Sequence, residues 1–292
     1  MSRQTDINSL NGRLFDAPRF ARSVGQTVAG LGGVLGGMLA LSVACTEFKP
    51  SSDIESTGTG ALIGNGTPLE NATTWGCLQR PPASNSQARD TVSYTVRIVD
   101  SITNEPPPGL VVQACDDIDL DCARPVSPRT GVSPDGRVRI SLAQGFDGYF
   151  EVLSETTLPT RLYPDGILDD DVDGVLLELI DEQTALALAA GAGVELEPDT
   201  GLVLARAFDC QGTLSSGIRL ENDTGGVAFA FIDGLPIPGP VTGGEGLIVF
   251  ANVPEGYTFI EGTIEDTGTA MGSTTVLSRP GWLVYADVRP PP

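Results

Sequence analysis

The chain has 292 residues, of which 38 are acidic and 17 basic, giving a formal net charge of −21, and it contains no histidine. Without histidine there is no Ser-His-Asp or Cys-His catalytic group, no histidine-ligated zinc and no imidazole proton shuttle. The acidic balance also argues against a nucleic-acid partner, because neutralising phosphates requires clustered Lys and Arg. A hydrophobic fraction of 40% can supply a folded core, and the length fits one or two domains.

Residues 1–44 have the features of a targeting segment. Four arginines lie in the first 22 residues, and an uncharged, glycine-rich apolar run of 17 residues extends from Val28 to Ala44. That run is short for a membrane-spanning helix, which needs about 20 apolar residues, and it is typical of a secretory signal. We therefore predict a signal peptide over residues 1–44.

The predicted signal ends at Ala44, directly before Cys45, in the stretch LSVAC. This stretch resembles the bacterial lipobox, whose cysteine is lipidated and becomes the mature N-terminus. The resemblance implies an exported lipoprotein, anchored to the cell envelope through Cys45, and Thr46 in the following position favours the outer membrane. A plain cleaved signal peptide is the alternative. Residues 45–75 are rich in Ser, Thr, Gly, Asn and Pro, so we predict a flexible tether there.

Four more cysteines are present, and four cysteines allow three disulfide pairings. Cys115 and Cys122 bracket the short acidic stretch CDDIDLDC, so we favour a local bridge between them and a long-range bridge between Cys77 and Cys210. The alternative is that all four cysteines are free thiols, which is disfavoured in an exported protein because disulfides form in oxidising compartments. A zinc site is disfavoured because the sequence has no CxxC pair.

Two regions share one β-strand pattern. In residues 76–155, short alternating stretches are separated by turns rich in Gly, Pro and Asp, with strands expected within 92–113, at 138–142 and at 148–153. In residues 201–290 the strands are expected within 201–221, 226–233, 242–262, 273–277 and 282–288. Many short strands with turns at this spacing are typical of antiparallel sandwiches. The fold class is therefore mainly β, with two antiparallel β-sandwich domains.

The second region resembles a carboxypeptidase regulatory-like domain, a transthyretin-like sandwich of seven strands. The matching residues are Gly201, Val203, Asp209, Gly212, Gly217, Thr242, Gly246, Phe250, Val253, Pro254, Gly256 and Tyr257. The first region matches less well, through Val96, Ile98, Asp100, Gly109, Val112, Thr130, Gly136, Val138, Gly145 and Tyr149. The whole chain is similar to predicted myxobacterial lipoproteins with such domains. The resemblance implies transthyretin-like or Ig-like sandwiches that act as accessory modules, and it implies no particular activity.

Residues 156–200 read as a spacer. Its first part is polar and turn-rich, and its second part predicts a short helix at about 182–190, capped by Asp181 and packed on a sandwich flank. Asp169, Asp171 and Asp173, followed by a glycine, match the opening of a calcium-binding loop. A solvated acidic turn is the alternative, because Ile180 stands where a calcium loop has its bidentate glutamate.

These observations favour a non-catalytic, membrane-anchored envelope lipoprotein that acts as a structural or interaction module. The alternative is a module that binds a carbohydrate or a protein, with calcium as its one candidate cofactor. A carboxylate-based hydrolase is less favoured, because so many acidic residues produce pairs of carboxylates by chance. We expect no catalytic residues. The expected partners are a membrane, through the lipid, and an unidentified envelope protein or carbohydrate.

Overall fold

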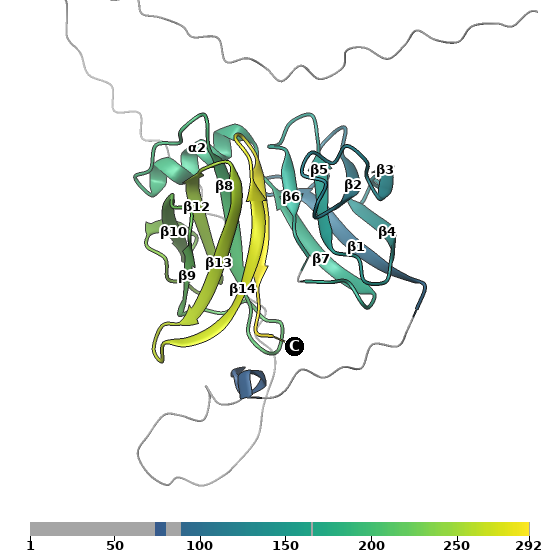
Figure 1. The fold of residues 1–292 in the computed structure, drawn as a ribbon. Helices are drawn as coiled ribbons and strands as arrows, with labels where there is room; N and C mark the ends of the chain where they lie inside the picture. The colour runs from purple at the N-terminus through teal and green to yellow at the C-terminus, as the bar shows by residue number, and fades with distance from the viewer. Residues whose placement is uncertain (1–73, 80–88, 165, 292) are drawn as a thin grey trace, which may run out of the picture. The chain divides into compact units, whose positions relative to one another are not determined.

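The computed structural model describes residues 74–79, 89–164 and 166–291. They form a mainly β structure, as predicted, in which fifteen strands make three sheets, with one α-helix and one short 3₁₀ helix (Figure 1). The predicted signal peptide, Cys45 and the tether as far as residue 73 lie outside the described residues. Within the described part of the chain, no helix is long and apolar enough to cross a membrane.

The first half contributes seven strands to two sheets. They are β1 (Thr91–Asp100), β2 (Val111–Asp116), β3 (Ser127–Gly131), β4 (Arg137–Ala143), β5 (Gly148–Leu153), β6 (Thr160–Leu162) and β7 (Val172–Leu179). Strands β4, β1 and β7 form a three-stranded sheet, in which β1 runs antiparallel to β4 and parallel to β7. The other four strands pair in the order β6-β5-β2-β3.

The remaining elements begin with the 3₁₀ helix η1 (Gly76–Gln79) and, after β7, continue with the helix α2 (Glu182–Gly191). The strands that follow are β8 (Gly201–Ala207), β9 (Ile218–Asn222), β10 (Val227–Ile232), β11 (Leu235–Pro238), β12 (Leu247–Val253), β13 (Gly256–Ile264), β14 (Thr269–Ser278) and β15 (Leu283–Val288). Strands β14, β13 and β9 form a second three-stranded sheet. The others pair in the order β11-β10-β12-β8-β15.

The two halves share one sheet. Strand β15 pairs in parallel with both β8 and β6, and this joins all the other strands into a nine-stranded sheet, β11-β10-β12-β8-β15-β6-β5-β2-β3. The junction between β15 and β6 consists of three residue pairs, with Val284 opposite Arg161 at its centre. The two β regions of the sequence are therefore fused through a continuous sheet.

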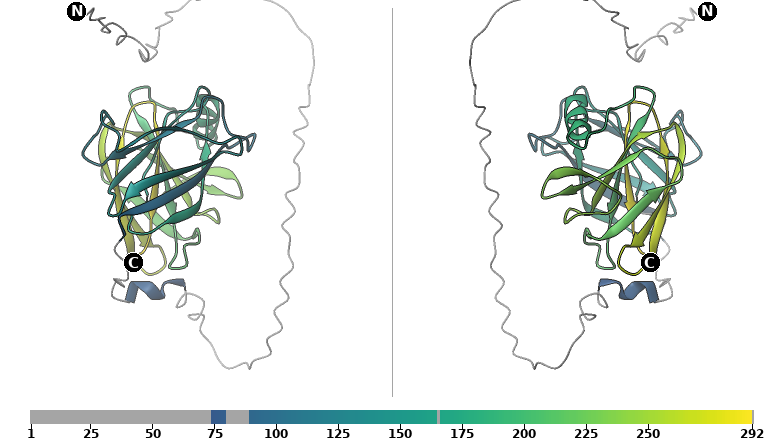
Figure 2. Two further views of the ribbon diagram at one scale, coloured as in Figure 1. Left: turned by 90° about the vertical axis from the view of Figure 1, so that its right-hand side faces the viewer. Right: turned by 90° about the vertical axis from the view of Figure 1, so that its left-hand side faces the viewer.

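Each small sheet covers a different face of the nine-stranded sheet. Side chains alternate along a strand, so successive residues belong to different faces. On β15, Leu283 and Tyr285 pack in the core that β4-β1-β7 helps to form, while Val284 and Ala286 pack in the core formed with β14-β13-β9. The left panel of Figure 2 looks onto the side of the molecule that carries the dark blue strand β1.

The segment expected to be a spacer provides two of the strands. Strand β6 extends the nine-stranded sheet and β7 completes the three-stranded sheet around β1, so residues 160–179 are part of the first sandwich. Three pairings, β1 with β7, β15 with β6 and β15 with β8, are parallel and depart from the antiparallel expectation. Parallel neighbours need long connections, so their pairing leaves no local turn signal in the sequence.

The predicted helix is confirmed. Asp181 caps it, since its side chain accepts a hydrogen bond from the backbone N–H of Thr184 at 2.7 Å. Ala185 and Ala189 are buried, and Ala185 belongs to the core that also contains Phe229. The helix therefore packs on the flank of the second half, where small alanine side chains allow a close approach.

Both favoured disulfides are confirmed. Cys115 pairs with Cys122, and Cys77 pairs with Cys210 across a sequence separation of 133 residues. The second bridge fastens the segment around η1 to the second half, where Trp75 also packs against the core. The two bridges therefore have different roles, one within a loop and one between distant parts of the chain.

Candidate interaction surface

A disulfide-closed loop projects from the end of β2. We call residues 116–121 the acidic loop, because four of these six residues are aspartates. Within it, the carbonyl of Asp116 accepts a hydrogen bond from the N–H of Asp119 at 3.0 Å, and the carbonyl of Asp119 accepts one from the N–H of Cys122 at 2.9 Å. Two successive turns and a covalent bridge therefore fix the backbone of the loop.

Three side chains hold the acidic loop from the sheet below it. The hydroxyl of Tyr149 donates to the carbonyl of Asp119 at 2.5 Å, and the guanidinium groups of Arg161 and Arg279 donate to the carbonyl of Leu120 at 2.8 and 2.6 Å. Burial raises the pKa of Tyr149 to about 12, so its hydroxyl remains a donor across the physiological range. Backbone carbonyls that face the protein need such donors, and here side chains provide them.

Arg161 is the centre of this support. Its side chain is fully buried, and Nη2 lies 2.9 Å from Oε1 of Glu151. The other carboxylate oxygen of Glu151, Oε2, accepts a hydrogen bond from Gln113 at 2.8 Å. The guanidinium carbon lies 4.5 Å from the ring centre of Tyr149 and 5.1 Å from that of Trp282. Nε and Nη1 make no hydrogen bond with any described residue, so the aromatic rings are the main partners of that part of the cation.

The outer side of the acidic loop carries an apolar side chain between carboxylates. Ile118 is 81% exposed and stands between Asp117 and Asp119. The carboxylate of Asp119 accepts hydrogen bonds from the N–H groups of Arg124 and Ala123, and these bonds hold its pKa below the usual range. Partial burial, followed by a hydrogen bond with Asp116, raises the pKa of Asp117. The loop thus presents Ile118 on a fixed backbone with acidic groups on both sides.

The residues predicted to bind calcium have partners in the protein. Asp171 accepts hydrogen bonds from the backbone N–H and the hydroxyl of Ser93 at 2.7 and 2.9 Å, and its other oxygen lies 3.3 Å from Arg89. The bonds from Ser93 are the main reason that the pKa of Asp171 is lowered. Asp169 precedes β7 and Asp173 lies within it, on the exposed side.

Among the described residues, one group of three possible metal-ligating side chains has its ligand atoms within 4.8 Å of one another, and it consists of Cys115, Cys122 and Glu151. Because the two cysteines form a disulfide, they offer no thiolates for a metal. The three aspartates near β7 do not form such a group, and their assignment to calcium stays a prediction.

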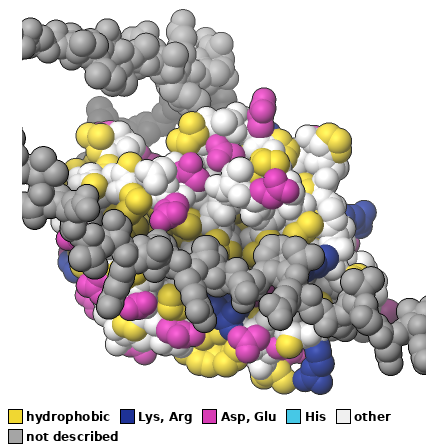
Figure 3. All heavy atoms as spheres, turned by 90° about the horizontal axis from the view of Figure 1, so that it is seen from above, with side chains coloured by type: hydrophobic (Ala, Val, Ile, Leu, Met, Phe, Trp, Pro, Cys, Tyr) yellow, Lys and Arg dark blue, Asp and Glu magenta, His cyan; other side chains and the backbone are white. Residues whose placement is uncertain are grey.

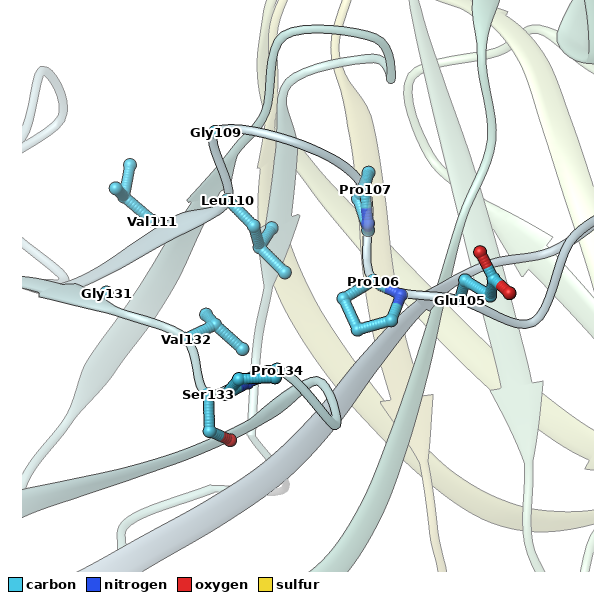
Figure 4. Close-up of a pocket in the computed structure, with 10 residues that line it drawn as sticks. All are labelled: Glu105, Pro106, Pro107, Gly109, Leu110, Val111, Gly131, Val132, Ser133 and Pro134. Atoms are coloured by element: carbon cyan, nitrogen blue, oxygen red, sulfur yellow. The ribbon is translucent and has the colours of Figure 1, made fainter.

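A groove of about 660 Å³ lies between the turn after β1 and the turn before β4 (Figure 4). Apolar side chains dominate its lining, which includes Pro106, Leu110, Val132 and Pro134, and Glu105 lies at one end. Ser133, the one hydroxyl in the lining, is occupied by hydrogen bonds with Asp135 and Arg137. The groove brings together no pair of carboxylates and no activated nucleophile.

The acidic loop is recognisable in the sequence, but the residues beneath it are not. Glu151 and Arg161 lie in short strands whose alternating pattern suggests that they face solvent. The available signal is that Tyr149 shares the face of Glu151, since an aromatic residue beside a charge on one strand face indicates that the face is covered. Arg279 comes from the distant β14–β15 connection, and nothing local in the sequence predicts its contact with the loop.

No protein-family model matches the chain, and no curated protein is similar to it in sequence. Several solved structures match it weakly. The Bacillus anthracis TIE protein is 12% identical with a TM-score of 0.22, covering 69% of this chain and 34% of that protein. A streptococcal ancillary pilin is 13% identical with a TM-score of 0.21, covering 70% of this chain and 64% of that one.

The major pilin subunit BcpA of Bacillus cereus is 11% identical with a TM-score of 0.24, covering 68% of this chain and 99% of that one. The chain thus spans about a third of the TIE protein and just under two thirds of the ancillary pilin. TM-scores this low support no functional inference. The resemblance to carboxypeptidase regulatory-like domains stays a prediction.

Proposed function

We propose that this chain is a non-catalytic structural or interaction module of the bacterial cell envelope, anchored by a lipid on Cys45, and that it meets its partner through the acidic loop. The observation that carries the proposal is the construction of that loop. Its inner side is fixed by a disulfide and by Tyr149, Arg161 and Arg279, while Ile118 is left exposed. A rigid loop loses little entropy on binding, and such preorganisation favours recognition.

The ionisable groups of the described core support a non-catalytic role. Its buried charged residues are Glu151, Arg161 and Asp287, and all are ion-paired: Glu151 with Arg161, and Asp287 with Arg206 at 2.6 Å. A catalytic carboxyl group typically has a raised pKa and lies in a cleft. Among the described carboxylates, Asp117 is the one whose pKa is raised, and it lies on the exposed acidic loop rather than in the groove.

The two disulfides support export, since disulfides persist in oxidising compartments. The surface is also acidic: on the face shown in Figure 3, Asp and Glu side chains are spread widely, and Lys and Arg lie mostly at the margins. A partner of the acidic loop is therefore expected to offer cationic groups around an apolar contact.

Lipid anchoring is tested by expressing the full chain and its Cys45→Ala variant in a Gram-negative host. We expect the unmodified chain to fractionate with membranes and its mature N-terminal peptide to carry acyl chains by mass spectrometry. The variant should be released from the membranes, because stable anchoring depends on the acyl chains. A Thr46→Ala variant, which changes the neighbouring residue and keeps Cys45, should remain in the membrane fraction. An unmodified N-terminus on the parent chain would overturn the anchoring.

A second candidate function is carbohydrate binding through the outer face of β13. Tyr257 and Phe259 are two residues apart on this strand and are 55% and 41% exposed, so both rings point away from the core. Exposed aromatic rings on a flat sheet can stack on the apolar faces of sugar rings. Binding of purified envelope polysaccharides that is lost in Tyr257→Ala and Phe259→Ala, but kept in Ile118→Ala, would favour this function over the first.

A further inference from the structure

The outer face of the sheet β4-β1-β7 carries a cluster of arginines. In the antiparallel pairing of β1 with β4, Arg97 is directly opposite Arg137, and Thr95 is directly opposite Arg139. The residues between them on both strands, such as Val96 and Val138, are buried, so the arginines point away from the core. We call Arg97, Arg137 and Arg139, together with Leu176, the arginine face. The sheet that carries it lies on the side of the molecule shown in the left panel of Figure 2.

The cations of the arginine face are incompletely neutralised. Like charges directly opposite one another on paired strands destabilise a sheet, and Arg97 and Arg137 are such a pair. Asp135 lies 3.7 Å from Arg137, and Arg139 donates to the hydroxyl of Ser93 at 2.9 Å. Among the described residues, Arg97 has no ion pair and no side-chain hydrogen bond. In a chain this acidic, two arginines that face each other at a cost to folding indicate that they bind something outside the fold.

An apolar side chain accompanies these cations. Leu176 on β7 is in register with Arg97 in the parallel pairing and is 43% exposed. The arginine face therefore offers an apolar contact beside guanidinium groups. Its complement is an exposed apolar side chain with carboxylates on both sides, which describes Ile118 between Asp117 and Asp119.

The acidic loop and the arginine face lie on opposite sides of the first half. On β2 and β5, Ala114 and Phe150 belong to the core beneath β4-β1-β7, whereas Cys115 and Tyr149 point to the other face, where the acidic loop is attached. One molecule therefore cannot bring its own loop to its own arginine face, and the contact is available between two molecules.

We propose that the arginine face binds the acidic loop of a second copy of this chain, which rests on the proposed function and names the partner of its loop. The contact is heterologous, so each copy can give its loop to one neighbour and its arginine face to another, and the association is open-ended. Long-range repulsion between acidic bodies is screened beyond about 8 Å at physiological ionic strength, and the short-range contact then decides. A loop-sized interface is weak, and confinement to one membrane raises its effective concentration.

A charge exchange tests the proposal. Sedimentation velocity of the full chain carrying Cys45→Ala should show self-association that rises with concentration. Arg97→Glu on the arginine face and Asp117→Arg on the acidic loop should each weaken association at least about tenfold, because each places like charges together. An equimolar mixture of these two variants should recover association, because the reversed loop of one now matches the reversed face of the other. Glu255→Arg, the same charge change on an exposed residue in the turn between β12 and β13, should leave association unchanged.

Disulfide trapping gives an independent readout. A mixture of Ile118→Cys and Leu176→Cys chains, mildly oxidised, should yield the mixed dimer in excess of both homodimers. Ile102→Cys, which is 74% exposed on another turn, replaces Ile118→Cys in the control mixture and should give no such excess. Statistical proportions of the three dimers would overturn the proposal.

Two other outcomes would overturn the proposed contact between copies. The parent chain could stay monomeric at all concentrations, or it could stay monomeric while Arg97 binds an anionic polysaccharide. A monomer that is still lipidated on Cys45 in the envelope would leave the proposed function standing. A chain that is not lipidated but still self-associates would overturn the proposed anchoring and leave the contact between copies standing.

Discussion

Arg161 and Val284 are neighbours on paired strands and point to the same side of the nine-stranded sheet, yet their surroundings differ completely. Val284 lies in an apolar core covered by the sheet β14-β13-β9. Arg161 lies under the acidic loop, among Glu151, Gln113 and aromatic rings. A covering sheet satisfies its own backbone groups and needs only apolar contacts, whereas a covering loop leaves carbonyls that the layer below must satisfy.

The largest effect is expected from the bridge that ties the chain's N-terminal side to the second half. Replacing Cys77 and Cys210 together by serine should lower the free energy of unfolding by about 5 kcal/mol, because the bridge closes a very long loop in the unfolded chain. Replacing Cys115 and Cys122 together should cost only about 2–3 kcal/mol, since that loop is short. Chemical denaturation compares the two. Equal losses would show that loop closure does not govern their stabilisation.

Breaking the buried ion pair compares the loop-covered part of this side of the sheet directly with the sheet-covered part. Arg161→Met leaves Glu151 buried without its cation and should cost about 3–5 kcal/mol. Val284→Ala, its matched change on the paired strand, should cost about 2 kcal/mol through lost contacts and a cavity. Combining Arg161→Met with Glu151→Leu should restore part of the loss, because no buried charge is then unpaired. Urea denaturation measures all four proteins, and a double variant worse than Arg161→Met would contradict this account.

Removing the cap of α2 should have a smaller effect. Asp181→Ala deletes the acceptor for the N–H of Thr184 and should lower stability by about 1 kcal/mol. Asp181→Asn keeps an acceptor at the same place and should lose much less. Thermal unfolding of the two variants separates the cap from a general effect of charge, and equal losses would assign the effect to charge.

Acid should weaken the loop-covered half gradually. Since hydrogen bonds lower the folded-state pKa of Asp119 below its unfolded value, its contribution to stability is present above about pH 4 and is lost as pH falls through the folded pKa. Asp119→Asn should therefore reduce the acid dependence of unfolding. Glu265→Gln is the matched change in the other half, where Arg219 lowers the pKa of Glu265. Unfolding curves from pH 2 to 6 test both, and an unchanged slope in Asp119→Asn would exclude its contribution.

Local signals in the sequence were enough for much of the fold. Alternation located β5 and β8, and Asp181 located the start of α2. The sequence does not predict strand β7, because Asp171, Asp173 and Gly174 are typical of a turn, although they form the irregular entry to the strand beside β1. The three-residue β6 is too short for a period to be detected. Its pairing with β15 is decided by tertiary contacts, which local patterns do not encode.

Only one of the two proposed contact surfaces, the acidic loop, can be predicted from the sequence. The acidic loop was visible because its cysteines and aspartates are contiguous. The arginine face was not, because Arg97 and Arg139 come together only through the register of β1 with β4. Arg279 reaches the loop across a sequence separation of 159 residues from Leu120, which only the fused sheet makes possible.

The bridge between Cys77 and Cys210 also decides where a mechanical load enters the protein. If the chain is held from its N-terminal side, tension arrives at Cys77 before it reaches β1. The covalent bond passes that tension to Cys210, in the turn after β8, rather than along the backbone to the first strand. Strand β1 is therefore shielded from being peeled from β4 and β7, and the arginine face stays intact under a pull that would otherwise open that sheet first.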